Sequence, residues 1–576
     1  MTLAQLAVLA GLAFLLAELV RGKRSAAMLF ATLAFVFILL DLVPLDQGIA
    51  QLTNQGLLTV VVLLLLSIVL DKSRLLEELA DRLVRGRYRV ALARLFTGTA
   101  LYSAFLNNTA VVASLIGPLK RSRHHPASRL LLPMCYAASL GGVLTLVGSS
   151  TNLLVNSLMI GQGLPALHIF DLFPVGICIV LASALMMIAT YPRLLPMQPP
   201  VDEPLSDYFI EAKVRADSRM VGRTVEENGL RQLSHLFLAE MVRDGRVIAP
   251  VEPDRMIRPD DILVFTGDVT RLDLLARFDG LITHGEHYDL PVDNLVEVVV
   301  AANSVLARRT IKQAEFRAQF DAAVVAVRRG SERLRGPLAD VQLEVGDTLV
   351  LAVGADFDKR NNLNRNFVIV SRKQLQKFSD PRKSAVAITG FLAAIVLSAL
   401  GVVELLKALL ALLALFLALG YVRTADLRRN MPYAIIVIIA AALVIAQAVV
   451  ATGAAGLLAS ALLHGAGDFG PHGALALVLG LTWLLTELMT NNAAAALAFP
   501  VAFGVAQQLG VDPMPFLMAV IYGASCSFLT PYGYQTNLMV MSPGRYQFSD
   551  YLRAGAPIAL VFLLVAFVAI PVVFPF

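Results

Sequence analysis

Gly148-Ser-Ser-Thr-Asn-Leu-Leu-Val155 and Gly533-Tyr-Gln-Thr-Asn-Leu-Met-Val540 decide the fold, because they are two copies of one pattern, G-x-x-T-N-L-x-V. Each copy follows an asparagine pair in an apolar stretch, within 103–109 in the first half and 486–492 in the second. Two elements therefore recur in the same order and at matched spacing. Paired polar breaks at corresponding points of two hydrophobic halves are the best sequence indication of a transporter's binding site.

The composition is that of a polytopic membrane protein. Of the 576 residues, 57% are hydrophobic and only 16% are charged, and the mean hydropathy is +0.70, far too apolar for a soluble protein. The net charge of +5 is explained by basic cytoplasmic loops. The expected partner is therefore the lipid bilayer, and nucleic acid is not expected.

The sequence gives no sign of an enzyme, and none of a metal site other than one for sodium. Cys135, Cys178 and Cys526 lie in apolar segments without metal-ligand spacing, and we expect them to be ordinary buried residues. We find no nucleophile and base in a credible arrangement and no phosphate-binding loop, so neither catalysis nor an organic cofactor is expected.

Apolar runs near the length of a bilayer crossing predict five crossings in each half. The runs lie near 2–20, 25–45, 55–70, 130–160 and 168–190, and near 384–401, 403–421, 432–450, 512–541 and 554–574. The first run precedes its basic cluster, so it is interpreted as a retained span rather than a cleaved signal peptide.

Lysine and arginine fix the predicted sides of the membrane. The segments expected to be cytoplasmic are basic, namely 21–24, 71–94 and 120–125, whereas 45–55 and 161–168 contain neither residue and are expected outside. The apolar stretch 95–119 then has both flanks on the cytoplasmic side. It is predicted to be a re-entrant hairpin with Asn107 and Asn108 at its tip.

The second half gives the same result with the opposite direction. The loop 451–473 and the segment 507–512 lack lysine and arginine, so 474–506 is predicted to be a hairpin that enters from outside, with Thr490, Asn491 and Asn492 at its tip. Because each half has an odd number of crossings, the two halves have opposite orientations.

The predicted fold is a polytopic α-helical membrane protein with an inverted repeat of 5+5 transmembrane helices, two re-entrant hairpins and two broken helices. The membrane halves are 1–200 and 380–576. The glycine, hydroxyl and asparagine residues of both G-x-x-T-N segments interrupt apolar, helix-forming sequence. Non-helical backbone at membrane depth persists only where protein or an aqueous cavity satisfies its amides. Both termini are expected outside the plasma (inner) membrane, with residues 200–380 in the cytoplasm.

The polar stretch between the halves contains a second duplication. Val214-Arg-Ala-Asp-Ser-Arg-Met-Val-Gly-Arg-Thr-Val225 matches Val300-Ala-Ala-Asn-Ser-Val-Leu-Ala-Arg-Arg-Thr-Ile311, and Pro259-Asp-Asp-Ile-Leu-Val-Phe265 matches Val345-Gly-Asp-Thr-Leu-Val-Leu351. Short apolar runs with a turn signal between them predict small α+β modules, at 206–285 and 291–372.

These modules resemble the C-terminal ligand-binding domain of potassium-conductance regulators, the TrkA-C (RCK C-terminal) type. The resemblance rests on the S-x-x-x-G/R-R-T opening and the late P/G-D-D-x-L-V strand. It implies that the modules pair, and that they sense a small ligand such as a nucleotide or cyclic dinucleotide. A dimerisation or gating scaffold without a ligand is the alternative that the residues leave open.

The hairpin tips and the two unwound G-x-x-T-N segments, which we call the first and second joints, favour cation-assisted anion binding. They contain no lysine or arginine, so positive charge for an anion has to come from half-helix N-termini and from bound cations. Asparagine, serine and threonine side chains, together with unwound carbonyls, provide the oxygen ligands that sodium prefers.

These motifs resemble those of the divalent anion sodium symporter (DASS) family, which carries dicarboxylates, tricarboxylates or sulfate. The resemblance implies a sodium-coupled symporter, a homodimer whose hairpin-bearing units move against a scaffold in an elevator-like cycle. The implied anion-binding residues are Asn107, Asn108, Thr109, Thr490, Asn491 and Asn492. The implied sodium ligands are Ser103, Asn107, Asn108, Gly148, Asn152, Thr486, Met489, Asn491, Gly533 and Asn537.

Two departures from that family leave the anion open. The tips carry Asn107 and Asn492 where the family has serine and threonine, and Ser-Ser-Thr-Asn and Tyr-Gln-Thr-Asn replace its Thr-Pro-Pro-Asn loops. With the paired modules, this variant looks closer to the branch associated with sulfate uptake, so sulfate is slightly favoured over a four-carbon dicarboxylate.

One intramembrane carboxylate and one rival function remain. Glu487 lies beside the expected ligand Thr486, and an ionisable residue inside the membrane is by default a candidate functional residue. It either couples protons or forms a structural pairing, and the structural role is favoured.

The rival function is that of a proton-coupled anion carrier or an arsenite-type exporter of the same architecture. Asparagine in a membrane helix can also act only as a contact between helices.

Overall fold

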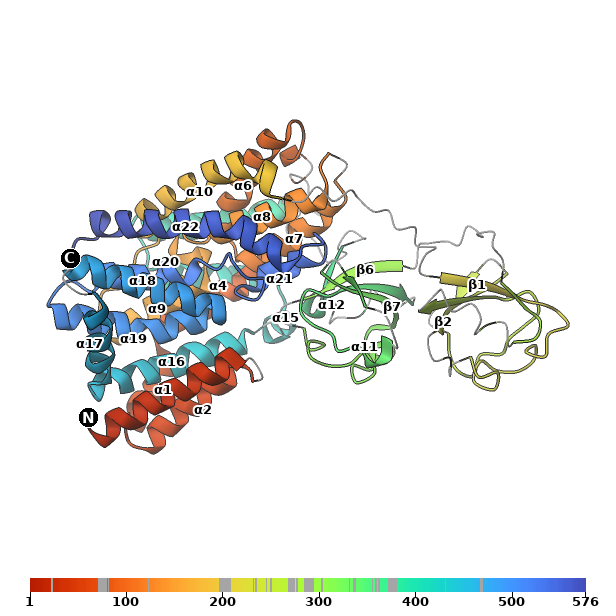
Figure 1. Ribbon diagram of the computed structural model, residues 1–576, viewed down its shortest axis with the longest axis horizontal. Helices are drawn as coiled ribbons and strands as arrows, with labels where there is room; N and C mark the ends of the chain where they lie inside the picture. The colour runs from red at the N-terminus through yellow and green to blue at the C-terminus, as the bar shows by residue number, and fades with distance from the viewer. Residues whose placement is uncertain are drawn as a thin grey trace.

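The computed structural model describes residues 1–195, 209–283, 295–370 and 381–576, apart from short gaps, of which 71–79 and 268–274 are the longest. The predicted domain boundaries at 200–206, 285–291 and 372–380 lie outside the described residues. A helical bundle forms one end of the molecule and two β-sheets form the other, and both chain termini lie at the end of the bundle away from the sheets (Figure 1).

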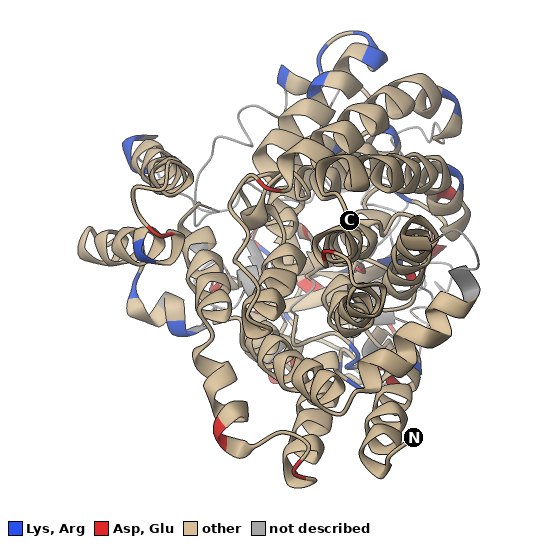
Figure 2. Cartoon of the chain, turned by 90° about the vertical axis from the view of Figure 1, so that its left-hand side faces the viewer, with Lys and Arg blue, Asp and Glu red and all other residues tan. Residues whose placement is uncertain are grey.

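The prediction of a helical membrane protein with several spans is confirmed. Eight helices of the described chain are long and apolar enough to cross a membrane. In Figure 2, which views the bundle from the end that carries the termini, few residues on the helices are charged. Many large hydrophobic side chains of the helices are exposed, among them Phe35, Leu185 and Leu560, as is expected of surfaces in contact with lipid.

The helices follow the predicted order in each half. In the first half they are α1 (Leu3–Arg21), α2 (Ala26–Leu39), α3 (Leu45–Ala50), α4 (Gln55–Leu70), α6 (Tyr88–Ser103), α7 (Asn108–Lys120), α8 (Ala127–Gly141), α9 (Ser150–Gly161) and α10 (Phe173–Leu194). In the second half they are α13 (Pro381–Ala399), α14 (Leu405–Ala418), α15 (Thr424–Arg429), α16 (Tyr433–Ala451), α17 (Ala454–Ala466), α18 (Gly470–Leu488), α19 (Asn491–Leu509), α20 (Met514–Ser525), α21 (Gln535–Met541) and α22 (Phe548–Val573).

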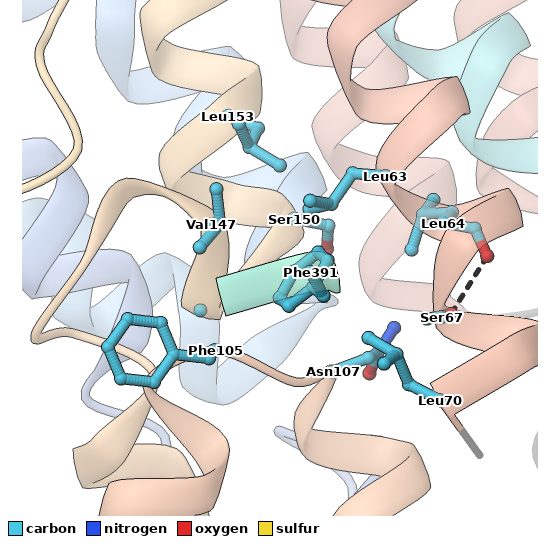
Figure 3. Close-up of a pocket in the computed structure, with 11 residues that line it drawn as sticks. Leu63, Leu64, Ser67, Leu70, Phe105, Asn107, Val147, Ser150, Leu153 and Phe391 are labelled. Atoms are coloured by element: carbon cyan, nitrogen blue, oxygen red, sulfur yellow. Dashed lines mark hydrogen bonds between the residues drawn. The ribbon is translucent and has the colours of Figure 1, made fainter. Parts of the chain in front are cut away.

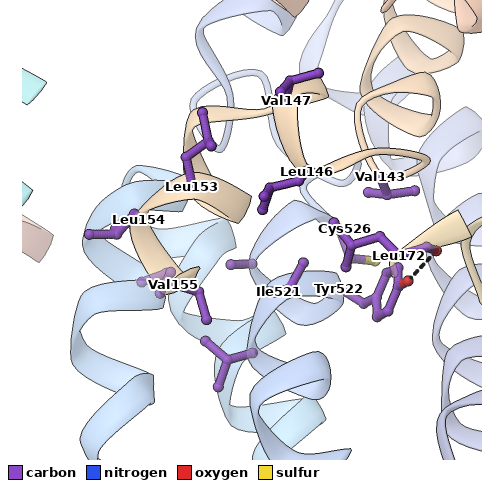
Figure 4. Packing of buried hydrophobic residues seen from close by; sticks show 14 of the residues in the cluster. Val143, Leu146, Val147, Leu153, Leu154, Val155, Leu172, Ile521, Tyr522 and Cys526 are labelled. Carbon is purple, nitrogen blue, oxygen red and sulfur yellow. Dashed lines mark hydrogen bonds between the residues drawn. The ribbon is translucent and has the colours of Figure 1, made fainter. Parts of the chain in front are cut away.

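Helix packing repeats between the halves. The hairpin α6–α7 packs on α8, as the hairpin α18–α19 packs on α20, and α10 packs along α22. The halves also interlock, since α9 packs against α19 and α21 packs against α7. Helix α9, which follows the first joint, also packs against α20, and Figure 4 shows Leu146 and Val155 near Ile521 of that helix.

Two expectations are wrong in detail. The segment 451–473, predicted as a loop, contains α17, which packs against α18 and α19; absence of charge does not separate a loop from a helix, and alanine and leucine favour a helix here. Cys178, expected to be buried, is exposed on α10, because only part of that helix faces the bundle.

The insert folds into two antiparallel sheets with the same strand order. The first module has β1 (Phe209–Val214), β2 (Leu236–Arg243), β3 (Arg246–Ile248), β4 (Ile262–Gly267) and β5 (Leu281–Thr283), ordered β3-β2-β4-β1-β5. The second has β6 (Leu295–Val300), β7 (Ala322–Arg329), β8 (Glu332–Arg333), β9 (Thr348–Val353) and β10 (Phe367–Ile369), ordered β10-β6-β9-β7-β8, with the short helices α11 (Phe316–Phe320) and α12 (Leu363–Asn366).

The duplicated acidic motif has the same structural task in both modules. Arg243 makes a bidentate ion pair with the buried Asp261, at 2.8 and 2.7 Å. Arg329 pairs in the same way with the buried Asp347, at 2.8 Å for both bonds. Paired hydrogen bonds between guanidinium and carboxylate are strong and directional, so each pair fixes the turn that leads into the late strand.

The second module lies directly on the membrane bundle. Lys120, at the end of α7, forms an ion pair with Glu297 of β6. Thr348 of β9 donates to Ser542, just beyond α21, at 2.8 Å. The second module therefore contacts both the first hairpin and the segment that follows the second joint.

Candidate functional site

Two asparagines hold the broken helices in the same way. In the first joint, between α8 and α9, the Asn152 amide nitrogen donates to the carbonyls of Gly142 and Thr145, both at 2.9 Å. In the second joint, between α20 and α21, Asn537 donates to the carbonyls of Ser527 and Thr530, both at 3.0 Å. The repeated asparagine of the motif thus satisfies the carbonyls that the helix break exposes.

Each joint also has a threonine that the sequence reasoning missed. Thr145 Oγ1 accepts from the Gly148 amide at 3.1 Å, and Thr530 Oγ1 accepts from Gly533 at 2.9 Å. The same hydroxyls donate to a hairpin carbonyl, Ala104 in the first half and Glu487, at 3.4 Å, in the second. The signal was present, because a threonine stands three residues before both motif glycines.

The backbone after the motif glycine is extended in both joints. Ser149 has φ −138° and ψ 141°, and its counterpart Tyr534 has φ −140° and ψ 141°. Each residue is the N-cap of the helix that follows, α9 or α21. The free N–H groups of those helices therefore begin inside the bundle, where they favour negative charge.

The hairpin turns are capped and partly buried, although Thr490 at the second tip is exposed. Asn107 accepts from the Thr109 amide at 2.9 Å, and Thr490 accepts from the Ala493 amide at 3.4 Å. Ser103 and Asn108 are buried in the first turn, as Thr486 and Asn491 are in the second. Thr486 Oγ1 lies 2.9 Å from Asn491 Oδ1 and 2.8 Å from the Ala524 carbonyl.

Oxygen atoms gather around one end of the Asn108 carboxamide. This end lies 2.5 Å from Ser103 Oγ, 3.2 Å from the Gly148 carbonyl and 3.3 Å from the Ala138 carbonyl, and the other end lies 3.1 Å from the Tyr534 hydroxyl. We call the oxygens of Ser103, Ala138 and Gly148 the first oxygen cluster. A Cβ at Gly142 would stand 2.8 Å from the Asn108 amide, so a glycine is needed there.

The tip of each hairpin meets the joint of the other half. Asn492 Oδ1 accepts from Ser150 Oγ at 3.3 Å and from Thr151 Oγ1 at 3.1 Å. In the opposite direction, Asn108 contacts Tyr534. Ser150, Thr151 and Tyr534 were not among the predicted site residues, although all three lie inside the G-x-x-T-N motifs.

A cavity borders this meeting point (Figure 3). Its polar lining comes from Asn107 of the first tip, Ser150 of the first joint and Ser67 of α4. Ser67 donates to the Leu64 carbonyl at 2.8 Å, so its oxygen remains able to accept. The remaining lining residues are Leu63, Leu64, Leu70, Phe105, Val147, Gly148, Leu153 and Phe391.

Most of the predicted site residues are therefore brought together. Ser103, Asn107, Asn108 and Gly148 gather in the first half, and Thr486 and Asn491 in the second, with Gly533 in the joint beside Glu487. Thr109, Met489 and Thr490 lie in the same hairpin turns. The amide nitrogens of Asn152 and Asn537 are used to hold the joints, and Asn152 Oδ1 is a buried acceptor without a partner.

Glu487 holds the second joint. Its Oε1 accepts from the amides of Phe528 and Leu529 at 3.0 and 2.9 Å. Its Oε2 accepts from the Thr530 amide at 3.1 Å and from the Thr530 hydroxyl at 3.0 Å. All four donors belong to the second joint, so Glu487 ties the second hairpin to it.

The hairpin turns and the joints offer mainly oxygen atoms as ligands for a metal ion. Among the described residues, no group of three or more His, Cys, Asp or Glu could hold a metal ion. Hydroxyl, amide and carbonyl oxygens suit hard cations rather than transition metals.

Residues 12–520 match the family described as Citrate transporter, CitMHS. The chain belongs to this family. As a CitMHS family member, it is a multi-pass membrane transporter rather than an enzyme.

Several proteins are similar to this chain over most of its length. A protein of Chlamydomonas reinhardtii, named as a sulfur deprivation response regulator, is 32% identical over 95% of this chain and 98% of its own length. An uncharacterised transporter of Synechocystis, sll0640, is 29% identical over 92% and 91%. Sodium/sulfate cotransporter 1 of C. reinhardtii is 30% identical over 63% of this chain and 43% of its own length.

Proposed function

We propose that this protein is a sodium-coupled symporter of a divalent anion, with sulfate favoured over a four-carbon dicarboxylate. The observation that carries the proposal is the first oxygen cluster, in which Ser103 Oγ and two backbone carbonyls face one end of Asn108. Two of these groups accept hydrogen bonds only. A sodium ion among them would be bound by oxygens alone.

The second half provides the counterpart. Thr486 Oγ1 and Asn491 Oδ1 lie beside the Ala524 carbonyl at the end of α20, with the Gly533 backbone in the adjacent joint. Two sodium sites, one in each half, would give the positive charge that the tips lack. The anion then lies where tips and joints meet, held by N–H and O–H donors of residues such as Asn107, Ser150 and Asn492.

Sulfate is favoured by the character of these groups and by the relatives. The meeting point offers amides and hydroxyls rather than an arginine that would grip a carboxylate in a bidentate manner. Relatives bear the names sodium/sulfate cotransporter 1 and 2.

The test is uptake of labelled sulfate and succinate into proteoliposomes. Uptake should require an inward sodium gradient, and Asn108→Ala and Asn491→Ala should each abolish it. Gln507→Ala, an exposed amide at the far end of α19, should transport like the wild type. Retained uptake in both asparagine variants would refute the site assignment, and flux driven by a pH gradient alone would favour the proton-coupled or arsenite-type alternative.

The insert, on this proposal, is cytoplasmic and comprises two TrkA-C-like domains, 206–285 and 291–372, that adjust transport. Its support is the common strand order of the two sheets and the contact of the second with the hairpin. Calorimetry of fragment 201–383 with nucleotides and cyclic dinucleotides tests this. No binding heat with any of them would leave the insert as a scaffold.

The proposed transport unit consists of the hairpins and joints, moving in an elevator-like cycle against the remaining helices of a homodimer. The oligomeric state in detergent or nanodiscs, measured by light scattering, tests the dimer. A monomer that still transports would exclude the dimeric scaffold.

A further inference from the structure

Tyr534 connects the second joint to the first hairpin. Its hydroxyl lies 3.1 Å from the Asn108 carboxamide, which belongs to the other half of the chain. The counterpart of Tyr534 in the first joint is Ser149, whose side chain accepts from the local Thr151 amide instead. At this position the two joints therefore differ, since Tyr534 contacts the opposite hairpin whereas Ser149 caps its own helix.

The two ends of the Asn108 carboxamide have different surroundings. One end faces the first oxygen cluster, and the other faces Tyr534. If the amide nitrogen faces the cluster, its two N–H groups have three acceptors within reach, on Ser103, Ala138 and Gly148, at 2.5, 3.3 and 3.2 Å. If Oδ1 faces the cluster, it meets two carbonyl oxygens without a proton between them, which is unfavourable unless a cation lies among them.

The orientation of Asn108 decides what Tyr534 does. With the nitrogen toward the cluster, Oδ1 faces Tyr534, and the tyrosine donates its only O–H to it at 3.1 Å. With Oδ1 toward the cluster, the NH₂ group donates to the tyrosine oxygen. The tyrosine O–H is then free to donate to another acceptor.

We propose that Tyr534 is a positioning residue that links cation binding to anion binding by reversing its hydrogen bond with Asn108. A cation in the first oxygen cluster turns Asn108 Oδ1 inward and its NH₂ group toward Tyr534. The Tyr534 O–H and the second N–H of Asn108 then face away from the cation, toward an anion. Without the cation, the same surface presents the Asn108 oxygen, which repels an anion.

This inference rests on the proposed sodium-coupled function. A hydrogen bond to a charged group changes affinity by roughly tenfold to a hundredfold. Because the Tyr534 O–H becomes available only after the cation binds, its loss is expected to weaken anion binding in sodium and to have no effect in its absence.

The experiment measures the sulfate Kd of the purified full-length protein by calorimetry, once in saturating sodium and once with choline in place of sodium. Succinate replaces sulfate if the wild type transports only succinate. Tyr534→Phe removes one hydroxyl, and Tyr532→Phe is the matched control, since Tyr532 lies in the same loop with 65% of its surface exposed. Sodium binding alone is followed by the rise in Tm that sodium produces.

In Tyr534→Phe, sulfate affinity in sodium should fall roughly tenfold or more, with the choline value and the sodium-induced rise in Tm unchanged. Tyr532→Phe should behave like the wild type. The inference is overturned if Tyr534→Phe keeps the full sodium-dependent gain, or if it loses affinity equally in sodium and in choline.

A second variant keeps the test decisive if Tyr534→Phe folds poorly. Asn108→Asp has two acceptor oxygens and no N–H, so it cannot reverse the hydrogen bond. Sodium should still raise its Tm, and sodium should tighten sulfate binding less than it does in the wild type; a gain as large as that of the wild type overturns the inference. If the wild type itself shows no sodium-dependent gain, the proposed function fails instead.

Discussion

At the scale of single residues, Glu487 shows how a charged group is accommodated inside an apolar bundle. Its two oxygens take four donors from three consecutive residues of the second joint. The first half has Ala104 at this position, and there the Thr145 hydroxyl of the joint donates to the Ala104 carbonyl. The carboxylate is therefore a structural addition of the second half, where Pro531 and Tyr534 make the joint different.

Glu487→Gln is expected to destabilise the second joint. One carboxylate oxygen becomes an NH₂ group that faces N–H donors, and a buried donor left without an acceptor costs about 1–3 kcal/mol. We expect a lower Tm and weaker sodium binding, with an unchanged pH profile of uptake between about pH 6 and 8. Glu404→Gln is the control, because that side chain is 59% exposed. An altered pH profile at full stability would contradict the structural role.

At the scale of elements, strand β2 carries a buried carboxylate at its bulge. The ladder between β2 and β4 shifts between Leu238 and Glu240, as that between β7 and β9 shifts between Val324 and Ala326. Glu240 is 5% exposed and its Oε1 has no hydrogen-bond partner. Burial raises the pKa of Glu240 to about 7. The second module has Ala326 at the equivalent position of its bulge.

The insert should lose stability as pH rises. The folded protein holds the Glu240 proton up to about pH 7, whereas the unfolded chain releases it at the ordinary, lower pKa of a glutamate. The free energy of unfolding is therefore greatest below that lower pKa and falls as the pH rises to about 7. Glu240→Gln should remove this slope and be the more stable form at pH 8. Hydrogen exchange of β2 and β4 in the full-length protein, from pH 5 to 8 with rates corrected for pH, is the measurement. An equal slope in the variant would contradict it.

At the scale of the whole molecule, the second module joins the insert to the elements that carry the site. Gly346 has φ +88°, and its Cβ would lie 2.2 Å from the Leu538 carbonyl of α21. The equivalent residue of the first module is Asp260, with φ +65°. The same turn thus tolerates aspartate where it is not docked on α21.

Gly346→Asp is expected to separate the second module from the bundle without unfolding it. The turn accepts aspartate in the first module, while the side chain would collide with α21. Hydrogen exchange should increase in α21 and at the end of α7, and remain unchanged in β7 and β9. Asp260→Gly is the control and should leave the contact intact. Increased exchange throughout the second module would mean that the variant unfolds it.

The sequence by itself determined the helical membrane class, and it indicated where the chain turns at the hairpins, where the helices break at the joints and where the insert is duplicated. These follow from local properties: hydrophobic length, charge next to the spans, and repeated polar breaks. It also placed Asn108 and Asn491 correctly in the buried turns, since a polar pair in the middle of an apolar hairpin marks the point where the chain reverses.

Only the tertiary structure decided which groups meet. The contacts of Asn492 with Ser150 and Thr151, and of Asn108 with Tyr534, join residues hundreds of positions apart, and no local pattern encodes them. It also assigned Asn152 and Asn537 to holding the joints, because a side chain's partner depends on the direction of the backbone carbonyls around it. That direction is set by the packing of the two halves against each other.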